Sequence, residues 1–332
     1  LCKKTFCEGG TILEIKYLLA FGCSLVLTLL VMPKLIPFLH KIKFGQSVRK
    51  EGPKSHMAKT GTPTMGGIVF VLVPILVMAI LNYKAFLTPE MLIVVFAYLG
   101  YALIGFIDDF LIVVKKNNDG LKPSMKFLMQ SVLAVIFYFA YTQIAKTTIQ
   151  IPVLHMTLEL GFLYFILIFF MFTCESNAVN LTDGLDGLCA GTSLIAIAPF
   201  VIFALLQKNN DLAMFLLAVS GALLGYLRFN IHPAKIFMGD TGSLAIGGLL
   251  AASAMILKQE ILLVLIGGVF VMELLSVVIQ VTSFKATGKR VFRMSPLHHH
   301  FELGGMKETN VVLMFWCIGL IFAVVGLWLG VL

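Results

Sequence analysis

The sequence predicts an all-α polytopic membrane protein of about ten transmembrane helices with a short periplasmic β-hairpin. Of its 332 residues, 59% are hydrophobic and 13% are charged, which is about half the charged share of a soluble domain. The mean hydropathy is +0.97. A soluble fold cannot bury that much apolar surface, so lipid must surround most of the chain.

Ten apolar runs are long enough, at roughly 20 residues, to cross a bilayer as helices. We expect them near residues 15–39, 66–82, 90–107, 127–143, 160–176, 187–206, 212–227, 242–257, 260–284 and 310–331. The ninth run contains Gly267, Gly268 and Glu273, so we expect this helix to be bent or broken. Residues 146–160 alternate β-branched and polar side chains around Pro152, which is typical of a short hairpin.

The chain is predicted to form one integral membrane domain over residues 1–332, since no internal repeat or low-complexity linker divides it. The first apolar run lacks a small-residue cleavage site, so no cleaved signal peptide is expected. Five loops on one side of the membrane hold 17 Lys and Arg residues, and the opposite loops hold four. The positive-inside rule therefore places the basic loops in the cytoplasm of a bacterial inner membrane and both termini outside. These loops lie near residues 40–65, 108–126, 177–187, 228–242 and 285–309.

The net charge of +8 is thus explained largely by topology, which argues against nucleic acid and for the lipid bilayer as the partner of the basic residues. The conspicuous polar clusters fall in the same five loops. A transporter would be expected to place its key charges near the bilayer midplane, where Glu273 alone is a candidate. Charges gathered at one membrane face instead indicate a catalytic surface that takes one substrate from water and one from lipid.

Five aspartates in these loops carry the chemical prediction: Asp108, Asp109, Asp183, Asp186 and Asp240. If clustered without a cation, they would repel one another. Carboxylates with no cysteine in reach favour Mg²⁺ or Mn²⁺ over zinc. Because Mg²⁺ is usually held by one or two carboxylates plus substrate phosphates, the pattern predicts phosphoryl chemistry on a diphosphate.

Each motif also has a purely structural interpretation. Asp108 and Asp109 could be a solvated helix end, NLTDGLDG a capped turn, and Asp240 a helix cap. Glu273 is interpreted as a buried acid facing another helix, and no function is assigned to it. The motifs occur together on one face, and this favours function over structure more than any one of them does.

The sequence resembles the phospho-N-acetylmuramoyl-pentapeptide transferase family over essentially its whole length. Five ordered motifs carry the resemblance: GPKSHMAKTGTPTMGG (52–67), GFIDDF (105–110), NAVNLTDGLDGL (177–188), FMGDTGSL (237–244) and SPLHHHFE (295–302). The resemblance implies transfer of phospho-MurNAc-pentapeptide from UDP-MurNAc-pentapeptide to undecaprenyl phosphate, giving lipid I and UMP with Mg²⁺ required. It also implies a homodimer and a role in peptidoglycan synthesis.

The resemblance further implies roles for individual residues. Asp240 would bind Mg²⁺, Asp108 would deprotonate the lipid phosphate with Asp109 beside it, and Phe237 would stack on uracil. The remaining implied residues are Asn180, Asp183 and Asp186 for nucleotide and diphosphate, Gly184 and Leu185 near uracil, Lys59, Thr64 and Gln280 on the nucleoside side, Lys116 and Lys126 in the cleft, and His298, His299 and His300 near the sugar phosphate.

Several alternatives remain open from the sequence. The chain could use another UDP-sugar with a polyprenyl phosphate, transport an anionic lipid, or act as a scaffold for other wall-synthesis enzymes. The sequence does not distinguish direct attack by the lipid phosphate from a covalent aspartyl-phosphate intermediate.

Overall fold

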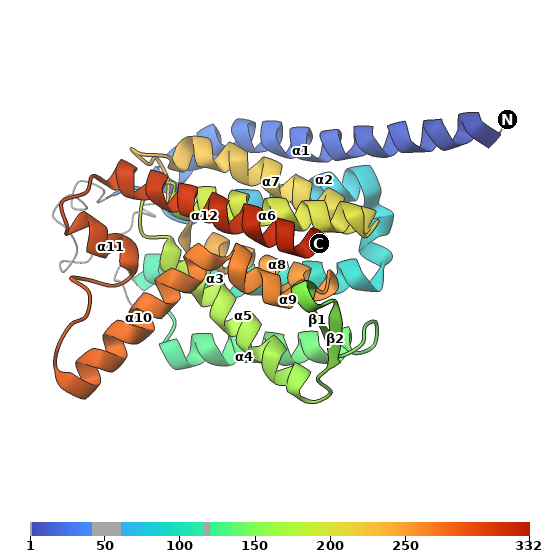
Figure 1. Cartoon of the computed structure of the whole chain (residues 1–332). Coiled ribbons are helices and arrows are strands. Elements are labelled where there is room, and N and C mark those ends of the chain that lie inside the picture. The colour runs from blue at the N-terminus through green and yellow to red at the C-terminus, as the bar shows by residue number, and fades with distance from the viewer. Residues whose placement is uncertain (1, 42–60, 116–119) are drawn as a thin grey trace.

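The computed structural model describes residues 2–41, 61–115 and 120–332. Within them, ten helices are long and apolar enough to cross a membrane, and Figure 1 shows most of them running roughly side by side. They are α1 (Cys2–Lys41), α2 (Gly67–Asn82), α3 (Pro89–Lys115), α4 (Pro123–Tyr141), α5 (Leu163–Thr182), α6 (Leu188–Leu206), α7 (Asn210–Asn230), α8 (Gly239–Ile256), α10 (Gly268–Thr287) and α12 (Glu308–Val331). The prediction of an all-α polytopic membrane protein with a small hairpin is confirmed.

The most buried helix is α8, which packs against α3, α5 and α2. Small residues allow α3 to approach it closely. A Cβ atom on Gly105 of α3 would lie 2.0 Å from the carbonyl oxygen of Asp240 in α8. Only glycine fits such a contact, so the backbones of these two helices meet where both carry aspartates.

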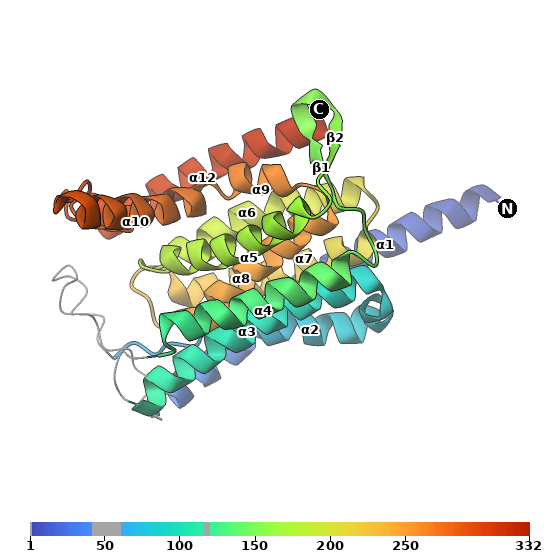
Figure 2. The same ribbon diagram turned by 90° about the horizontal axis from the view of Figure 1, so that it is seen from below.

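The ninth predicted span is broken, as expected. It forms the short helix α9 (Glu260–Ile266) and then α10, which are separated at Gly267. In Figures 1 and 2, α10 extends to the end of the molecule that carries α11 (Leu297–Glu302), and in Figure 1 it diverges from its neighbours. Apolar side chains such as Leu275, Ile279 and Phe284 of α10 are exposed, as expected for a helix that contacts lipid.

The predicted hairpin is present at the opposite end of the bundle. Strand β1 (Thr148–Ile151) pairs antiparallel with β2 (Met156–Glu159), and the 3₁₀ turn Pro152–Leu154 joins them. The Nζ of Lys258 donates to the carbonyl oxygens of Lys146 and Thr148 at 2.5 and 3.0 Å, which ties the hairpin to the turn between α8 and α9. Burial lowers the pKa of this lysine.

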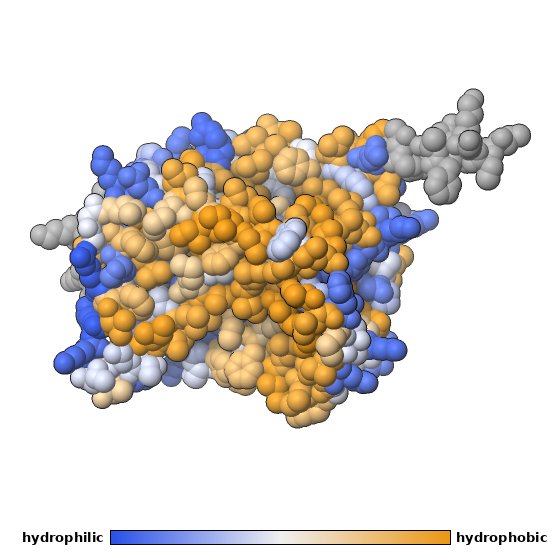
Figure 3. All heavy atoms as spheres, in the orientation of Figure 1, coloured by the Kyte–Doolittle hydropathy of each residue, from blue (hydrophilic) through white to orange (hydrophobic). Residues whose placement is uncertain are grey.

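The molecular surface agrees with a membrane protein. Figure 3 shows a broad hydrophobic zone across the middle of the visible face, with hydrophilic residues gathered toward the two ends. Both termini lie toward the end that carries the hairpin (Figure 1). We call this the hairpin end, and we call the opposite end, with α11, the site end.

Three predicted loops are shorter than expected because helices extend into them. Helix α3 continues to Lys115, so Asp108 and Asp109 lie inside a helix rather than after it. Asn180 lies in the last turn of α5, and Asp240 in the first turn of α8. The apolar residues that follow Asp109 allow helix α3 to continue, and hydrogen bonds from Asp240 and Thr241 satisfy the carboxylate of Asp109.

Candidate functional site

Four helices bring charged and polar side chains together at the site end. Asp240 of α8 forms an ion pair with Lys126 of α4, and the Nδ2 of Asn180 from α5 donates to its Oδ1 at 2.8 Å. The carboxyl group of Asp108 from α3 lies close enough to Asp240 to interact with it directly. Residues separated by more than 100 positions therefore form one polar cluster, in which Asp240 is the shared partner.

Asp109 anchors the beginning of α8. Its two carboxylate oxygens accept hydrogen bonds from the backbone N–H of Asp240 at 3.1 Å, the N–H of Thr241 at 2.9 Å and the hydroxyl of Thr241 at 2.6 Å. The two backbone N–H groups are donors that the first turn of a helix leaves unpaired, and a carboxylate is favoured there by the helix dipole. Asp109 is only 3% exposed, so its carboxylate does not face a substrate. Its hydrogen bonds instead hold Asp240 in position.

Asp108 is held differently. One of its oxygens accepts a hydrogen bond from the backbone N–H of Leu121 at 2.9 Å. A Cβ atom on Gly120 would lie 2.7 Å from its other oxygen. The segment before α4 therefore closes over this carboxylate, which is 7% exposed, whereas the side chain of Asp240 is 23% exposed. The two acids differ in access although they lie side by side.

The oxygens of this cluster fit a magnesium ion. Asp108 and Asp240 place two carboxyl groups beside the ammonium of Lys126. A further positive charge would relieve their repulsion. Carboxylate and amide oxygens are the donors that Mg²⁺ prefers, and Asp240 is the more accessible of the two acids. The expectation that Asp240 holds Mg²⁺ therefore agrees with the chemistry of the residues around it.

Two Gly-rich segments of the sequence, GTPTMGG (61–67) and GDTGS (239–243), meet next to this cluster. The N–H groups of Gly66 and Gly67 donate to the carbonyls of Phe237 and Met238, both at 2.9 Å, and the N–H of Phe237 donates to Pro63 at 2.8 Å. Thr64 is buried in this contact. The Phe237 side chain is half-buried, so part of the ring surface remains available for stacking.

A positive backbone angle makes glycine necessary at the start of α8. Gly239 has φ +73°, and a Cβ atom there would lie 2.5 Å from an oxygen of Asp109. This glycine turns the chain from Phe237 into α8, and Asp240 follows it. The motif FMGD therefore joins an aromatic ring and a carboxylate across a turn that no other residue fits.

The NLTDGLDG segment is tied to two residues that the sequence did not single out. One oxygen of Asp186 lies 3.0 Å from the Nδ1 of His232 and accepts from the N–H of Ala234 at 3.0 Å. Glu308 of α12 accepts from the backbone N–H of Asp186 at 2.9 Å. No motif marks His232 or Glu308, which come from distant segments.

In the described part of the chain, one group of three potential metal ligands has its ligand atoms within 4.8 Å of one another: Asp186, His232 and Glu308. This group could hold a metal ion by geometry. The hydrogen bonds within it also explain the arrangement without an ion, since they fix the turn that follows Asn180. Asn180 donates the hydrogen bond that ties this segment to Asp240.

The three histidines follow α10 and have different surroundings. His298 is buried and its Nδ1 lies 3.1 Å from Glu273. His299 lies 2.9 Å from Glu302, and His300 accepts from the backbone N–H of Arg293 at 3.1 Å. The acid at position 273 was noticed in the sequence because charges are rare in spanning helices, but nothing in the sequence indicated its partner.

Three further predicted residues complete the comparison with the sequence. Gln280 uses its amide within its own chain segment, accepting from Val291 and Phe292 and donating to the carbonyl of Phe292. Lys59 and Lys116 lie outside the described residues, so their predicted roles stay predictions. The structure thus joins Asp108, Asp109 and Asp240 with Asn180 and Lys126. Asp186 bonds to the segment that holds His232 and Ala234, and Gln280 makes a loop contact.

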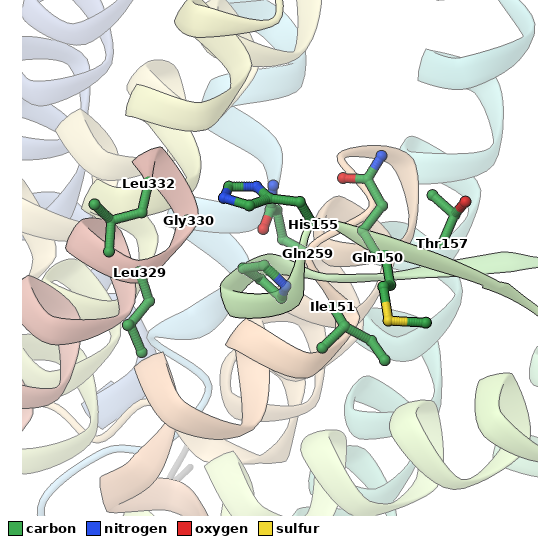
Figure 4. Close-up of a pocket in the computed structure, with 10 residues that line it drawn as sticks. Gln150, Ile151, His155, Thr157, Gln259, Leu329, Gly330 and Leu332 are labelled. Carbon is green, nitrogen blue, oxygen red and sulfur yellow. The ribbon is translucent and has the colours of Figure 1, made fainter.

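Two cavities are lined by none of Asp108, Asp109 and Asp240. Figure 4 shows a cavity of about 270 Å³ at the hairpin end, lined by residues such as Gln150, His155, Gln259 and Leu329. Another of about 460 Å³ lies at the site end between His40, Thr62 and Lys235. The first cannot serve the aspartate cluster because it lies at the opposite end of the bundle.

Known proteins resemble this chain closely. A family model described as glycosyl transferase family 4 matches residues 91–258. A phospho-N-acetylmuramoyl-pentapeptide-transferase from Geobacillus sp. (strain WCH70) is 53% identical over 322 residues, which is 96% of this chain and 99% of that protein. Proteins of the same name from Bacillus subtilis (strain 168) and Bacillus anthracis are 53% and 54% identical, and cover 92% and 96% of this chain and 95% and 99% of their own length.

Proposed function

The chain belongs to the family of phospho-N-acetylmuramoyl-pentapeptide transferases, and on this premise we propose that it transfers phospho-MurNAc-pentapeptide from UDP-MurNAc-pentapeptide to undecaprenyl phosphate. The products are lipid I and UMP. The observation that carries the proposal is the convergence of Asp108, Lys126, Asn180 and Asp240 at one end of a membrane-spanning bundle. A water-soluble nucleotide and a lipid phosphate can both reach such a position.

Electrostatics dominates the chemistry that the cluster must perform. Both reactants are anions, so their approach is opposed by repulsion. Lys126 supplies one fixed positive charge beside Asp240. When bound, Mg²⁺ would neutralise the diphosphate and stabilise the charge that develops on the leaving UMP. Asp240 is the residue that would hold it.

Asp108 and Asp109 have separate tasks in this proposal. A lipid phosphate is already largely ionised at neutral pH, so a base removes at most one remaining proton, and its contribution is modest. Asp108 is the candidate for that step because it adjoins Asp240 without being tied to the start of α8. Asp109 fixes the first turn of α8 and thereby the carboxylate of Asp240.

The nucleotide would be held by the joined Gly-rich segments and by the turn after Asn180. Phe237 offers a ring for the uracil, and Thr64 lies on the segment whose backbone pairs with it. The turn at 183–186 follows Asn180, which bonds to Asp240. Holding both phosphates in line can lower the barrier by several kcal/mol as an order of magnitude. The exposed apolar side chains of α10, such as Leu275, Ile279 and Phe284, would face the lipid from which the isoprenyl chain approaches.

The decisive experiment measures UMP release by the purified full chain in detergent. UDP-MurNAc-pentapeptide, undecaprenyl phosphate and Mg²⁺ are added together and then omitted one at a time. We expect release only when all three are present. Release from UDP-GlcNAc at an equal rate would favour a different sugar-1-phosphate transferase. No release in detergent, together with substrate accumulation in sealed vesicles, would favour a transporter.

We also propose that the site end faces the cytoplasm of a bacterial inner membrane and that the chain forms a homodimer. The orientation follows from the excess of Lys and Arg in the loops at the site end. The dimer follows from the family alone. Native mass spectrometry from detergent tests the dimer, with the mass of two chains expected; one chain at every protein concentration would contradict it.

A further inference from the structure

Glu273 in α10 is fully buried, yet it is surrounded by donors. One carboxylate oxygen accepts from the backbone N–H of Leu297 at 2.7 Å. The other lies 3.3 Å from the backbone N–H of His298 and 3.1 Å from its Nδ1. A buried carboxylate is tolerated when several hydrogen bonds satisfy it. The same contacts fix the start of α11 to a helix that crosses the membrane.

These contacts determine which nitrogen of His298 carries the proton. The oxygen that accepts the backbone N–H of His298 also faces Nδ1, so Nδ1 is the donor toward Glu273. The Nε2 atom is buried and has no hydrogen-bond partner among the described residues. A hydrogen on Nε2 would be a buried N–H without an acceptor among these residues, so the tautomer with its hydrogen on Nδ1 satisfies the ring better.

The bare nitrogen lies against the NLTDGLDG segment. A Cβ atom on Gly184 would lie 2.2 Å from Nε2 and 2.7 Å from the adjacent Cε1 of His298. The ring edge therefore touches the glycine backbone, between Asn180 on one side and Asp186 on the other. A lone pair fits this contact, whereas a hydrogen on Nε2 would be directed at the backbone of Gly184.

We propose that Glu273 is a positioning residue for the segment 183–186, on which it acts through His298. Glu273 sets the tautomer and the orientation of the ring, and the ring edge sets the place of Gly184. Neither side chain needs to touch a substrate for this effect. The inference deepens the function proposed above, because that function assigns nucleotide binding to the same segment.

The substitution Glu273→Gln tests the inference. The glutamine amide can donate to Nδ1, which moves the ring proton to Nε2 and pushes it against Gly184. We expect KM for UDP-MurNAc-pentapeptide to rise about ten-fold or more, in line with the loss of one buried polar contact, and KM for undecaprenyl phosphate to stay within about two-fold. The matched control is Glu175→Gln, which replaces another buried carboxyl group, on α5; both KM values should stay within about two-fold.

Two further variants separate positioning from a general loss of structure. Gly184→Ala presses on the same contact with Glu273 intact, so it should raise the nucleotide KM even if Glu273→Gln folds poorly. His298→Ala removes the link, so adding Glu273→Gln to it should raise KM no further. Equal KM values in Glu273→Gln and Glu175→Gln would overturn the inference, as would multiplied effects of Glu273→Gln and His298→Ala.

UDP affinity of the same full-length proteins in detergent is measured alongside. The same order of variants is expected there, with Glu273→Gln and Gly184→Ala weakest. If the UDP affinities of the variants follow this order but the wild type releases no UMP, the proposed reaction fails and the inference stands. If Glu273→Gln binds UDP as well as the wild type, the inference fails whatever the turnover.

Discussion

At the scale of single residues, the aspartates of this protein divide into structural and accessible groups. Asp109 gives its oxygens to the first turn of α8, while Asp240 keeps part of its carboxylate exposed. The sequence predicted that these acids belong together, because they occur in loops on one face. It did not predict this division, because the division depends on which backbone N–H groups lie opposite each carboxylate in the folded chain.

Removing the carboxylate of Asp240 should abolish activity without unfolding the protein. We expect Asp240→Asn to lower kcat by about 100-fold or more, because its charge would no longer face the cation on the diphosphate. Half-maximal activity should also require more Mg²⁺. Steady-state rates over a Mg²⁺ titration check both effects. Turnover like the wild type would place the metal ligand elsewhere.

Phe237 should affect substrate binding more than chemistry. Because its ring is half-buried at the junction of the two Gly-rich segments, Phe237→Ala removes a stacking surface and leaves the aspartates in place. We expect the nucleotide KM to rise by about five-fold or more, with a smaller change in kcat. Phe237→Tyr keeps a ring and serves as the control. An unchanged KM in the alanine variant would exclude stacking.

Thr241 should contribute to both stability and turnover. Its hydroxyl donates to the buried carboxylate of Asp109 at 2.6 Å, so Thr241→Val should cost about 1.5–3 kcal/mol of unfolding free energy. It should also lower kcat, because Asp240 is the preceding residue. Thr192→Val is the control, since that buried hydroxyl bonds only to a carbonyl of its own helix. Thermal unfolding and the rate of UMP release are measured for both variants. Equal melting temperatures and equal rates in Thr241→Val and Thr192→Val would contradict the role assigned to Asp109.

At the scale of elements, the sequence predicted those features that depend on the length and composition of a segment. The ten spans, the hairpin and the break near Gly267 were all predicted from apolar runs, alternation and glycines. The sequence did not predict where α3 and α5 end or where α8 begins, because tertiary contacts determine these helix ends. Asp108 and Asn180 seemed to follow helices when judged by polarity alone, yet polar partners on α8 and in the segment before α4 allow both to remain helical.

The contact between α3 and α8 should be sensitive to a single methyl group. Gly105→Ala would place a Cβ 2.0 Å from the backbone oxygen of Asp240, and backbone atoms there cannot yield easily. We expect a loss of about 1–3 kcal/mol in unfolding free energy, together with lower turnover. On the same helix, a Cβ at Gly100 would meet only the flexible end of Leu133 at 3.0 Å, so Gly100→Ala should be nearly neutral. Similar melting temperatures for the two variants would contradict this packing.

At the scale of the whole molecule, the chain forms a bundle with different chemistry at its two ends. Asp108, Lys126 and Asp240 lie near helix ends at the site end, which also carries α11. The hairpin and both termini lie at the opposite end. The charge pattern of the sequence agrees with this division, because the loops at the hairpin end hold only four Lys or Arg residues: Lys84, Lys146, Lys208 and Lys258. A potential site residue can thus be assigned to an end from sequence, but its contacts require the packing of four helices.

Orientation in the membrane is testable by labelling. In a variant without native cysteines, Lys208→Cys places a thiol between α6 and α7 at the hairpin end, and Lys289→Cys places one after α10 at the site end. Both positions are exposed. Since positively charged loops remain in the cytoplasm, a membrane-impermeant maleimide should label the Lys208→Cys protein in intact cells and the Lys289→Cys protein only after permeabilisation. The reverse pattern would place the aspartate cluster outside, where the cytoplasmic nucleotide proposed as its substrate could not reach it.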